Sequence, residues 1–120
     1  MVSCLIVDDS SYARTVIKKM LASNGHKIVG EAEDGEEAVE TFKDKRPELV
    51  TMDILMPKKN GIEATKEIKQ LDPKCKIIVC SSLHQKDLID EAKRAGAGDF
   101  IIKPFSEELL IQRIKRILEN

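Results

Sequence analysis

The sequence has no excess of charge of either sign. Its 20 Lys and Arg residues are balanced by 21 Asp and Glu residues, giving a formal net charge of −1 and an isoelectric point of about 6.1. A nucleic-acid-binding protein would normally carry a clear basic excess or a basic stripe. The composition therefore argues against DNA or RNA as the main partner.

Cysteine is also scarce, and its spacing disfavours two kinds of scaffold. Cys4, Cys75 and Cys80 are odd in number and include no C-x-x-C pair. Neither a disulfide framework nor a zinc site is therefore expected. Cys4 and Cys80 lie in apolar runs, where we expect small buried hydrophobic residues, as in a reducing compartment.

Long apolar runs are missing too. No stretch approaches the roughly 20 residues that a membrane span needs, and the first five residues lack the basic and apolar regions of a signal peptide. A cytoplasmic protein with no membrane partner is expected. The length of 120 residues fits one domain, 1–120, with one sizeable core.

Short apolar runs alternate with segments of helical period along the whole chain. The runs are rich in β-branched residues and mostly continuous, which is typical of strands buried on both faces. They cover residues 4–7, 27–30, 48–52, 77–80 and 100–102. Between them, apolar stripes indicate amphipathic helices, as at Ala13, Val16, Ile17, Met20 and Leu21.

Helix start signals agree with this alternation. Asp34 with Glu37, and Asn60 with Glu63, resemble capping boxes, and Ser106 is a good N-cap. Strictly alternating units predict an α/β fold, a doubly wound five-stranded parallel sheet with helices on both faces. An eight-fold barrel, the other fold built from alternating units, usually needs about 250 residues, so the length favours the open sheet.

In such open sheets, ligands bind at the carboxyl ends of the strands. Asp8 and Asp9 follow the first strand, Asp53 the third, Ser81 the fourth and Lys103 the fifth. Each motif alone is more often a turn, a helix cap or a loop than a site. Their convergence on one edge of the sheet makes a functional site the better interpretation.

The chemistry of this cluster favours a hard cation. Three neighbouring carboxylates repel one another, which raises at least one pKa unless positive charge is present. Lys103 supplies one charge, and an all-oxygen ligand set favours Mg²⁺, Mn²⁺ or Ca²⁺. A carboxylate beside Mg²⁺ is also a competent nucleophile toward phosphorus. The residues therefore point to phosphoryl transfer onto an aspartate.

Over its whole length the sequence resembles the receiver domains of two-component response regulators. The resemblance rests on residues 5–10 (LIVDDS), 30–38 (GEAEDGEEA), 52–57 (MDILMP), 60–61 (NG), 81, 95–100 (AGAGDF) and 103–105 (KPF). It implies a flavodoxin-like fold with strand order 2-1-3-4-5.

The family's site residues carry over to matching positions. Asp53 corresponds to the phosphoacceptor. Asp9 corresponds to the main Mg²⁺ ligand, assisted by Asp8, and the backbone carbonyl of Leu55 would complete the protein's share. Ser81 would bond the phosphoryl group.

Lys103 would pair with the same phosphoryl group, and the resemblance implies a cis bond between Lys103 and Pro104. It also implies a switch in which Ser81 moves toward the phosphate and the aromatic Phe100 turns inward. The output surface would lie on the fourth helix, fifth strand and fifth helix, carrying Lys86, Asp90, Lys93, Phe100 and Arg113.

This sequence departs from the family pattern at the site. Phe100 lacks the hydroxyl of the Tyr found in many chemotaxis members, and Ser81 replaces the commoner Thr. Leu55 and Leu83 stand where many members have a polar residue. We expect these leucines to restrict the attacking water and lengthen the phosphoryl lifetime.

The leading hypothesis is a monomeric, stand-alone chemotaxis regulator that is not an enzyme toward other substrates. A histidine kinase would phosphorylate it, a flagellar motor switch protein or archaeal motility adaptor would receive its signal, and a phosphatase could reset it. A phosphorelay intermediate and the receiver of a longer regulator stay open. An Mg²⁺-dependent aspartyl phosphatase is disfavoured, because Leu55 cannot transfer protons as such enzymes require.

Overall fold

Strands and helices alternate from one end of the chain to the other. The computed structural model describes residues 1–119. The strands are β1 (Ser3–Val7), β2 (Lys27–Ala32), β3 (Leu49–Met52), β4 (Lys76–Ser81) and β5 (Asp99–Ile102). The helices are α1 (Ser11–Ala22), α2 (Gly35–Lys45), α3 (Gly61–Leu71), α4 (Lys86–Ala95) and α5 (Glu107–Leu118).

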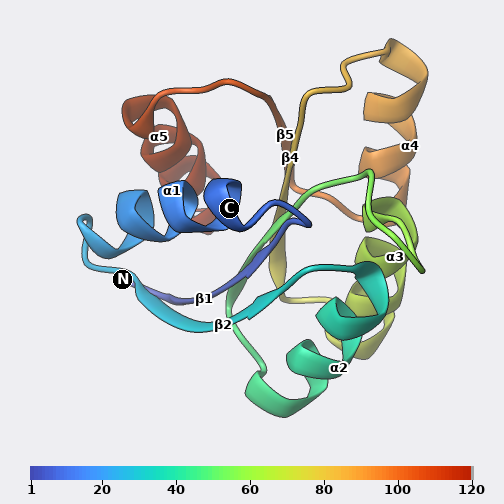
Figure 1. Cartoon of the computed structure of the whole chain (residues 1–120), viewed down its shortest axis with the longest axis horizontal. Helices are drawn as coiled ribbons and strands as arrows, with labels where there is room; N and C mark the ends of the chain where they lie inside the picture. The colour runs from blue at the N-terminus through green and yellow to red at the C-terminus, as the bar shows by residue number, and fades with distance from the viewer. Residues whose placement is uncertain (120) are drawn as a thin grey trace.

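The strands form one parallel sheet in the order β2-β1-β3-β4-β5. Helices α1 and α5 cover one face of this sheet, and α2, α3 and α4 cover the other (Figure 1). The predicted fold class and strand order are confirmed. The order also brings the carboxyl ends of β1 and β3 side by side at the centre of the sheet.

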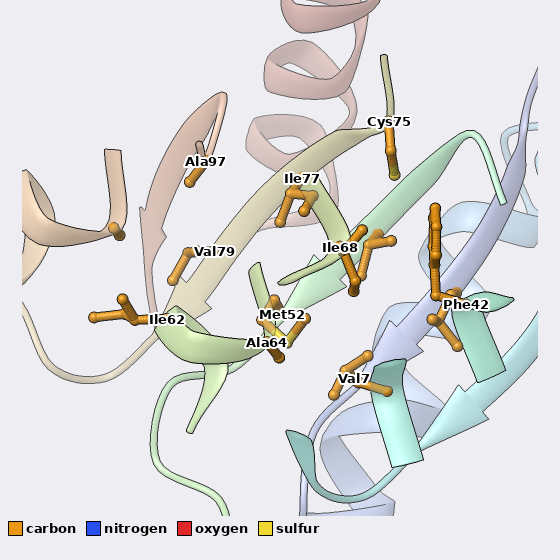
Figure 2. Close-up of a cluster of buried hydrophobic side chains, with 14 of the residues drawn as sticks. Val7, Phe42, Met52, Ile62, Ala64, Ile68, Cys75, Ile77, Val79 and Ala97 are labelled. Carbon is orange, nitrogen blue, oxygen red and sulfur yellow. The ribbon is translucent and has the colours of Figure 1, made fainter. Parts of the chain in front are cut away.

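Each face of the sheet carries its own apolar cluster, because side chains along a strand alternate between faces. Cys4 and Ile6 of β1 belong to the cluster under α1 and α5, whereas Leu5 and Val7 belong to the cluster under α2, α3 and α4. The second cluster includes the fully buried Phe42 (Figure 2). Burying a side chain of this size contributes roughly 1.5–3 kcal/mol.

The predicted helix caps form, with two differences. The side chains of Asp34, Asn60 and Ser106 accept hydrogen bonds from amides in the first turns of α2, α3 and α5. In a capping box, the Glu three residues into the helix accepts from the backbone amide of the N-cap residue. At α2 the Glu37 carboxylate instead accepts from the amide of Glu33, one residue before the N-cap, at 2.8 Å. At α3, Glu63 accepts a hydrogen bond from the side-chain amide of Asn60 and not from its backbone amide. Among residues 1–119, none of the helices is long and apolar enough to cross a bilayer.

Candidate functional site

The loop after β1 holds two carboxylates in different surroundings. Asp8 is 1% exposed, and its Oδ1 accepts a hydrogen bond from the Ser10 amide at 2.9 Å. Its own amide donates to the carbonyl of Ala32 at 3.0 Å, which extends the pairing of β1 with β2. Asp9 is exposed. The loop therefore fixes one carboxylate and leaves the next one open to solvent.

Asp53 completes an acidic cluster from the neighbouring strand. It follows β3, and its amide donates to the Val7 carbonyl at 3.0 Å, so it is tied to the end of β1. One carboxylate oxygen from each of Asp8, Asp9 and Asp53 lies within 4.8 Å of the others. The structure thus brings together the three carboxylates that the sequence placed at this edge.

Lys103 brings a positive charge to this cluster. Its Nζ lies 2.5 Å from Asp8 Oδ2 and 3.6 Å from Asp53 Oδ2. Burial alone would lower the pKa of Lys103, but the Asp8 hydrogen bond and the Asp53 charge raise it above its ordinary value. The side chain is therefore an ammonium at neutral pH. The bond from Lys103 to Pro104 is cis.

The electrostatics of Asp53 reflect an excess of negative charge. Burial raises its pKa, the ammonium of Lys103 opposes that effect, and the Asp8 charge adds to it, so the pKa rises from 3.8 to about 6. Asp53 is ionised at neutral pH but at a free-energy cost. A further cation at this position would relieve that cost.

The donor set fits a hard divalent ion. All three candidate side-chain ligands are carboxylates, with no Cys or His ligand in the described acidic cluster. Mg²⁺ is usually held by one or two carboxylates with waters and phosphate oxygens, and an exposed group such as Asp9 leaves room for those waters.

Ser81 stands at the same edge, at the end of β4. β4 pairs with β3, and Ser81 is 1% exposed. Its Oγ accepts a hydrogen bond from the Leu83 amide at 3.1 Å. The Ser81 hydroxyl proton is not used in that bond and can be donated to another oxygen.

Phe100 and Leu55 differ sharply in exposure. Phe100 is 8% exposed and packs in the cluster under α2, α3 and α4, so its ring faces inward in this structure. Leu55, two residues after Asp53, is 62% exposed. An exposed hydrocarbon side chain therefore lies two residues after Asp53, where a polar one would hold water.

Sequence reasoning included Gly61 only as part of a family motif and did not predict its contact with the loop after Asp53. A Cβ on Gly61 would lie 1.8 Å from the Asp53 carbonyl oxygen, and the Gly61 amide donates to Ile54 at 2.9 Å. Gly35 shows a similar close approach, since a Cβ there would lie 2.2 Å from the carbonyl oxygen of Lys59. A glycine inside a helical turn, where it is disfavoured, was the available signal.

A second missed residue is Arg14 of α1. Its guanidinium Nη1 donates to the backbone carbonyl of Asp8 at 2.7 Å. The apolar-stripe pattern assigned this helix to packing alone. Nothing in that pattern indicates a contact with the acidic loop.

Comparison with known proteins agrees with this geometry. The family model described as the response regulator receiver domain matches residues 4–115. The chain belongs to that family and is a receiver domain of the two-component response-regulator type.

Among its relatives are chemotaxis proteins named CheY. That of Thermotoga maritima is 46% identical over 113 residues, covering 94% of each chain. That of Bacillus subtilis is 48% identical over 114 residues, covering 95% of each. A crystal structure of the CheX–CheY–BeF3–Mg²⁺ complex from Borrelia burgdorferi has a TM-score of 0.94 at 34% identity, covering 97% of this chain and 88% of that one.

Proposed function

We propose that this chain is a phosphorylation-activated signalling switch in which Asp53 accepts a phosphoryl group from a histidine kinase in the presence of Mg²⁺. The observation that carries the proposal is the cluster of Asp8, Asp9, Asp53 and Lys103 at one edge of the sheet. The similarity to a CheY captured with BeF3 and Mg²⁺ supports it.

Asp8, Asp9, Asp53 and the backbone carbonyl of Leu55 are the groups that would hold Mg²⁺. When bound, Mg²⁺ would neutralise the carboxylates and the oxygens of the transferring phosphoryl group. The raised pKa of Asp53, about 6, still leaves its carboxylate ionised and nucleophilic at pH 7.

The transfer itself uses few protein groups. A carboxylate oxygen of Asp53 forms a bond to phosphorus while the phosphorus–nitrogen bond of the donor's phosphohistidine breaks. The electron pair of that bond stays on the imidazole nitrogen, which takes up a proton. The Lys103 ammonium and the Ser81 hydroxyl then donate hydrogen bonds to the phosphoryl oxygens of the acyl phosphate.

The phosphoryl group would be read out through the surface built from α4, β5 and α5. Drawing the Ser81 hydroxyl toward the phosphate would remove its bond to the Leu83 amide and alter the β4–α4 loop. Such a local electrostatic change biases a two-state element. Phe100, next to this loop in the same cluster as Leu83, would be held inward in the active state.

We infer a CheY-type role from the relatives. A CheA-type histidine kinase would supply the phosphoryl group in the cytoplasm, and a flagellar motor switch protein or an archaeal motility adaptor would bind the phosphorylated monomer. A phosphatase partner is supported by the CheX–CheY complex. The protein would catalyse only its own phosphorylation and dephosphorylation.

The whole chain, 1–120, would act as this one receiver. A phosphorelay role or a place in a longer regulator would use the same Asp53 chemistry and differ only in the partner. An aspartyl phosphatase would need a proton-transferring group at Leu55, which has none.

The test is intact mass after incubation with acetyl phosphate. Wild type with Mg²⁺ is expected to gain one phosphoryl group, and to gain none with EDTA or in Asp53→Asn. Asp44→Asn is the matched control, because this carboxylate lies on α2 and, among residues 1–119, forms an ion pair only with the adjacent Lys45. Equal phosphorylation of Asp53→Asn and Asp44→Asn would overturn the proposal.

A further inference from the structure

The side chain of Arg14 links α1 to two other parts of the fold. Its Nη1 donates to the Asp8 carbonyl at 2.7 Å, and its Nε donates to Glu31 Oε1 on β2 at 3.0 Å. The side chain is only 14% exposed. Two nitrogens of the guanidinium are therefore hydrogen-bonded to different parts of the fold, which fixes the position of the group.

Glu31 is held in turn by a second cation. Lys18 Nζ lies 2.7 Å from Glu31 Oε2, so the carboxylate receives Arg14 on one oxygen and Lys18 on the other. Those two hydrogen bonds hold the pKa of Glu31 below its ordinary value despite partial burial. Glu31 is ionised at neutral pH and serves as a fixed anchor for Arg14.

The carbonyl that accepts the hydrogen bond from Arg14 belongs to the peptide between Asp8 and Asp9, in the β1–α1 loop. The Asp8 carboxylate is already fixed by Ser10 and Lys103. The Asp9 carboxylate accepts no hydrogen bond from residues 1–119, so its placement depends on the backbone that carries it. Turning the Asp8–Asp9 peptide plane would swing Asp9 away from the other two carboxylates.

We propose that Arg14 is a positioning residue that holds the Asp8–Asp9 peptide and thereby presents the Asp9 carboxylate to the divalent cation. This inference rests on the proposed function, since it concerns the same cation site. Arg14 donates its hydrogen bonds to Glu31 and to the backbone carbonyl of Asp8, and to none of the three carboxylates of the acidic cluster. Residues that orient metal ligands from behind typically contribute 10- to 100-fold in metal affinity.

A simple electrostatic role predicts the opposite sign. Arg14 is a cation close to an acidic site, and removing it would by charge alone make Mg²⁺ bind more tightly. The positioning role predicts weaker binding. An Arg14→Lys variant separates the two further, because lysine keeps the charge but cannot reproduce the planar fork between Glu31 and the Asp8 carbonyl.

The experiment measures the Mg²⁺ dissociation constant by calorimetry, without any phosphodonor. Arg14→Met and Arg14→Lys are compared with wild type and with Lys18→Met. Lys18 is the matched control, because it pairs with the other oxygen of Glu31, and its removal leaves both hydrogen bonds of Arg14 in place. Amide NMR spectra and thermal unfolding without Mg²⁺ check that each variant is folded.

Both Arg14 variants are expected to bind Mg²⁺ about 10-fold more weakly than wild type or worse, and Lys18→Met to bind as wild type or slightly more tightly. Arg14→Met binding as tightly as Lys18→Met, or Arg14→Lys binding as wild type, would overturn the positioning role. If wild type binds no Mg²⁺, the proposed function fails and this inference fails with it. The wild-type arm therefore distinguishes the two failures.

Discussion

The ammonium nitrogen of Lys103 lies 2.5 Å from a carboxylate oxygen of Asp8. It stands more than an ångström farther from Asp53, at 3.6 Å. Lys103 therefore neutralises the buried Asp8 first and compensates Asp53 only in part. This unequal sharing is why burial can raise the pKa of Asp53 to about 6 although a lysine is close by.

Replacing Lys103 by Met is expected to raise the pKa of Asp53 further, since it removes the nearby positive charge that lowers it. Carboxyl-carbon NMR against pH, without Mg²⁺, measures the shift. Lys43→Met is the control, because Lys43 pairs with Glu40 on α2. An Asp53 pKa equal in both variants would contradict this account of the site.

The Asp53 carboxyl should also give the fold a particular pH dependence without Mg²⁺. Its pKa is raised in the folded state, from 3.8 to about 6, so the folded protein binds this proton more tightly than the unfolded chain does. Stability from this group is present below about pH 4 and is lost as pH rises toward about 6. Partial solvent contact reduces the effect to on the order of 1–2 kcal/mol.

Urea unfolding of wild type and Asp53→Asn at pH 4.5 and pH 7 isolates that contribution. The variant is expected to gain stability over wild type at pH 7 and to lose most of that advantage at the lower pH. If the two proteins differ in unfolding free energy by the same amount at both pH values, the ionised Asp53 carboxylate does not destabilise the folded state.

Gly61 is expected to tolerate no side chain. A Cβ there would lie 1.8 Å from the Asp53 carbonyl oxygen, so Gly61→Ala must displace the loop that carries Asp53. We expect a loss of about 2–3 kcal/mol in unfolding free energy and slower phosphorylation by acetyl phosphate. Gly98→Ala is the control, because its nearest neighbour would be 3.6 Å away. Equal effects of the two substitutions would refute the steric argument.

The leucines beside the site are predicted to slow the loss of the phosphoryl group. Leu55 is 62% exposed next to Asp53, and Leu83 packs at the margin of the core. Leu55→Asn combined with Leu83→Glu should speed autodephosphorylation at least about threefold, a barrier change of about 0.7 kcal/mol. Phosphorus NMR after donor removal follows the decay, with Leu71→Asn as a surface control. Decay no faster than wild type would sink the idea.

How far the sequence predicts this site depends on the kind of contact. Asp8, Asp53 and Lys103 could be placed because strand ends in a parallel sheet share one edge, and hydrophobic periodicity locates strand ends within a residue or two. The contacts of Gly61 with Asp53 and of Arg14 with Asp8 could not be placed. They depend on loop and side-chain geometry that no periodic pattern encodes.

Arg113 illustrates the same limit on the expected output surface. The resemblance places it on the output surface, and in the structure its guanidinium lies 2.9 Å from the buried carboxylate of Asp99. The same carboxylate also pairs with Arg116, at 2.8 Å. Burial would raise the pKa of Asp99, but the Phe100 amide and Arg113 hold it below its ordinary value. An ion pair between an element's first residue and a distant helix needs the tertiary fold to be known.

The most direct test of the central claim is to locate the phosphoryl group within the chain. Wild type would be phosphorylated with acetyl phosphate and Mg²⁺, reduced with borohydride to convert the aspartyl phosphate to homoserine, digested, and sequenced by mass spectrometry. The account predicts homoserine at Asp53, with Asp8 and Asp9 unchanged. Homoserine at Asp8 or Asp9, or at no aspartate while the intact protein carries the added mass, would contradict it.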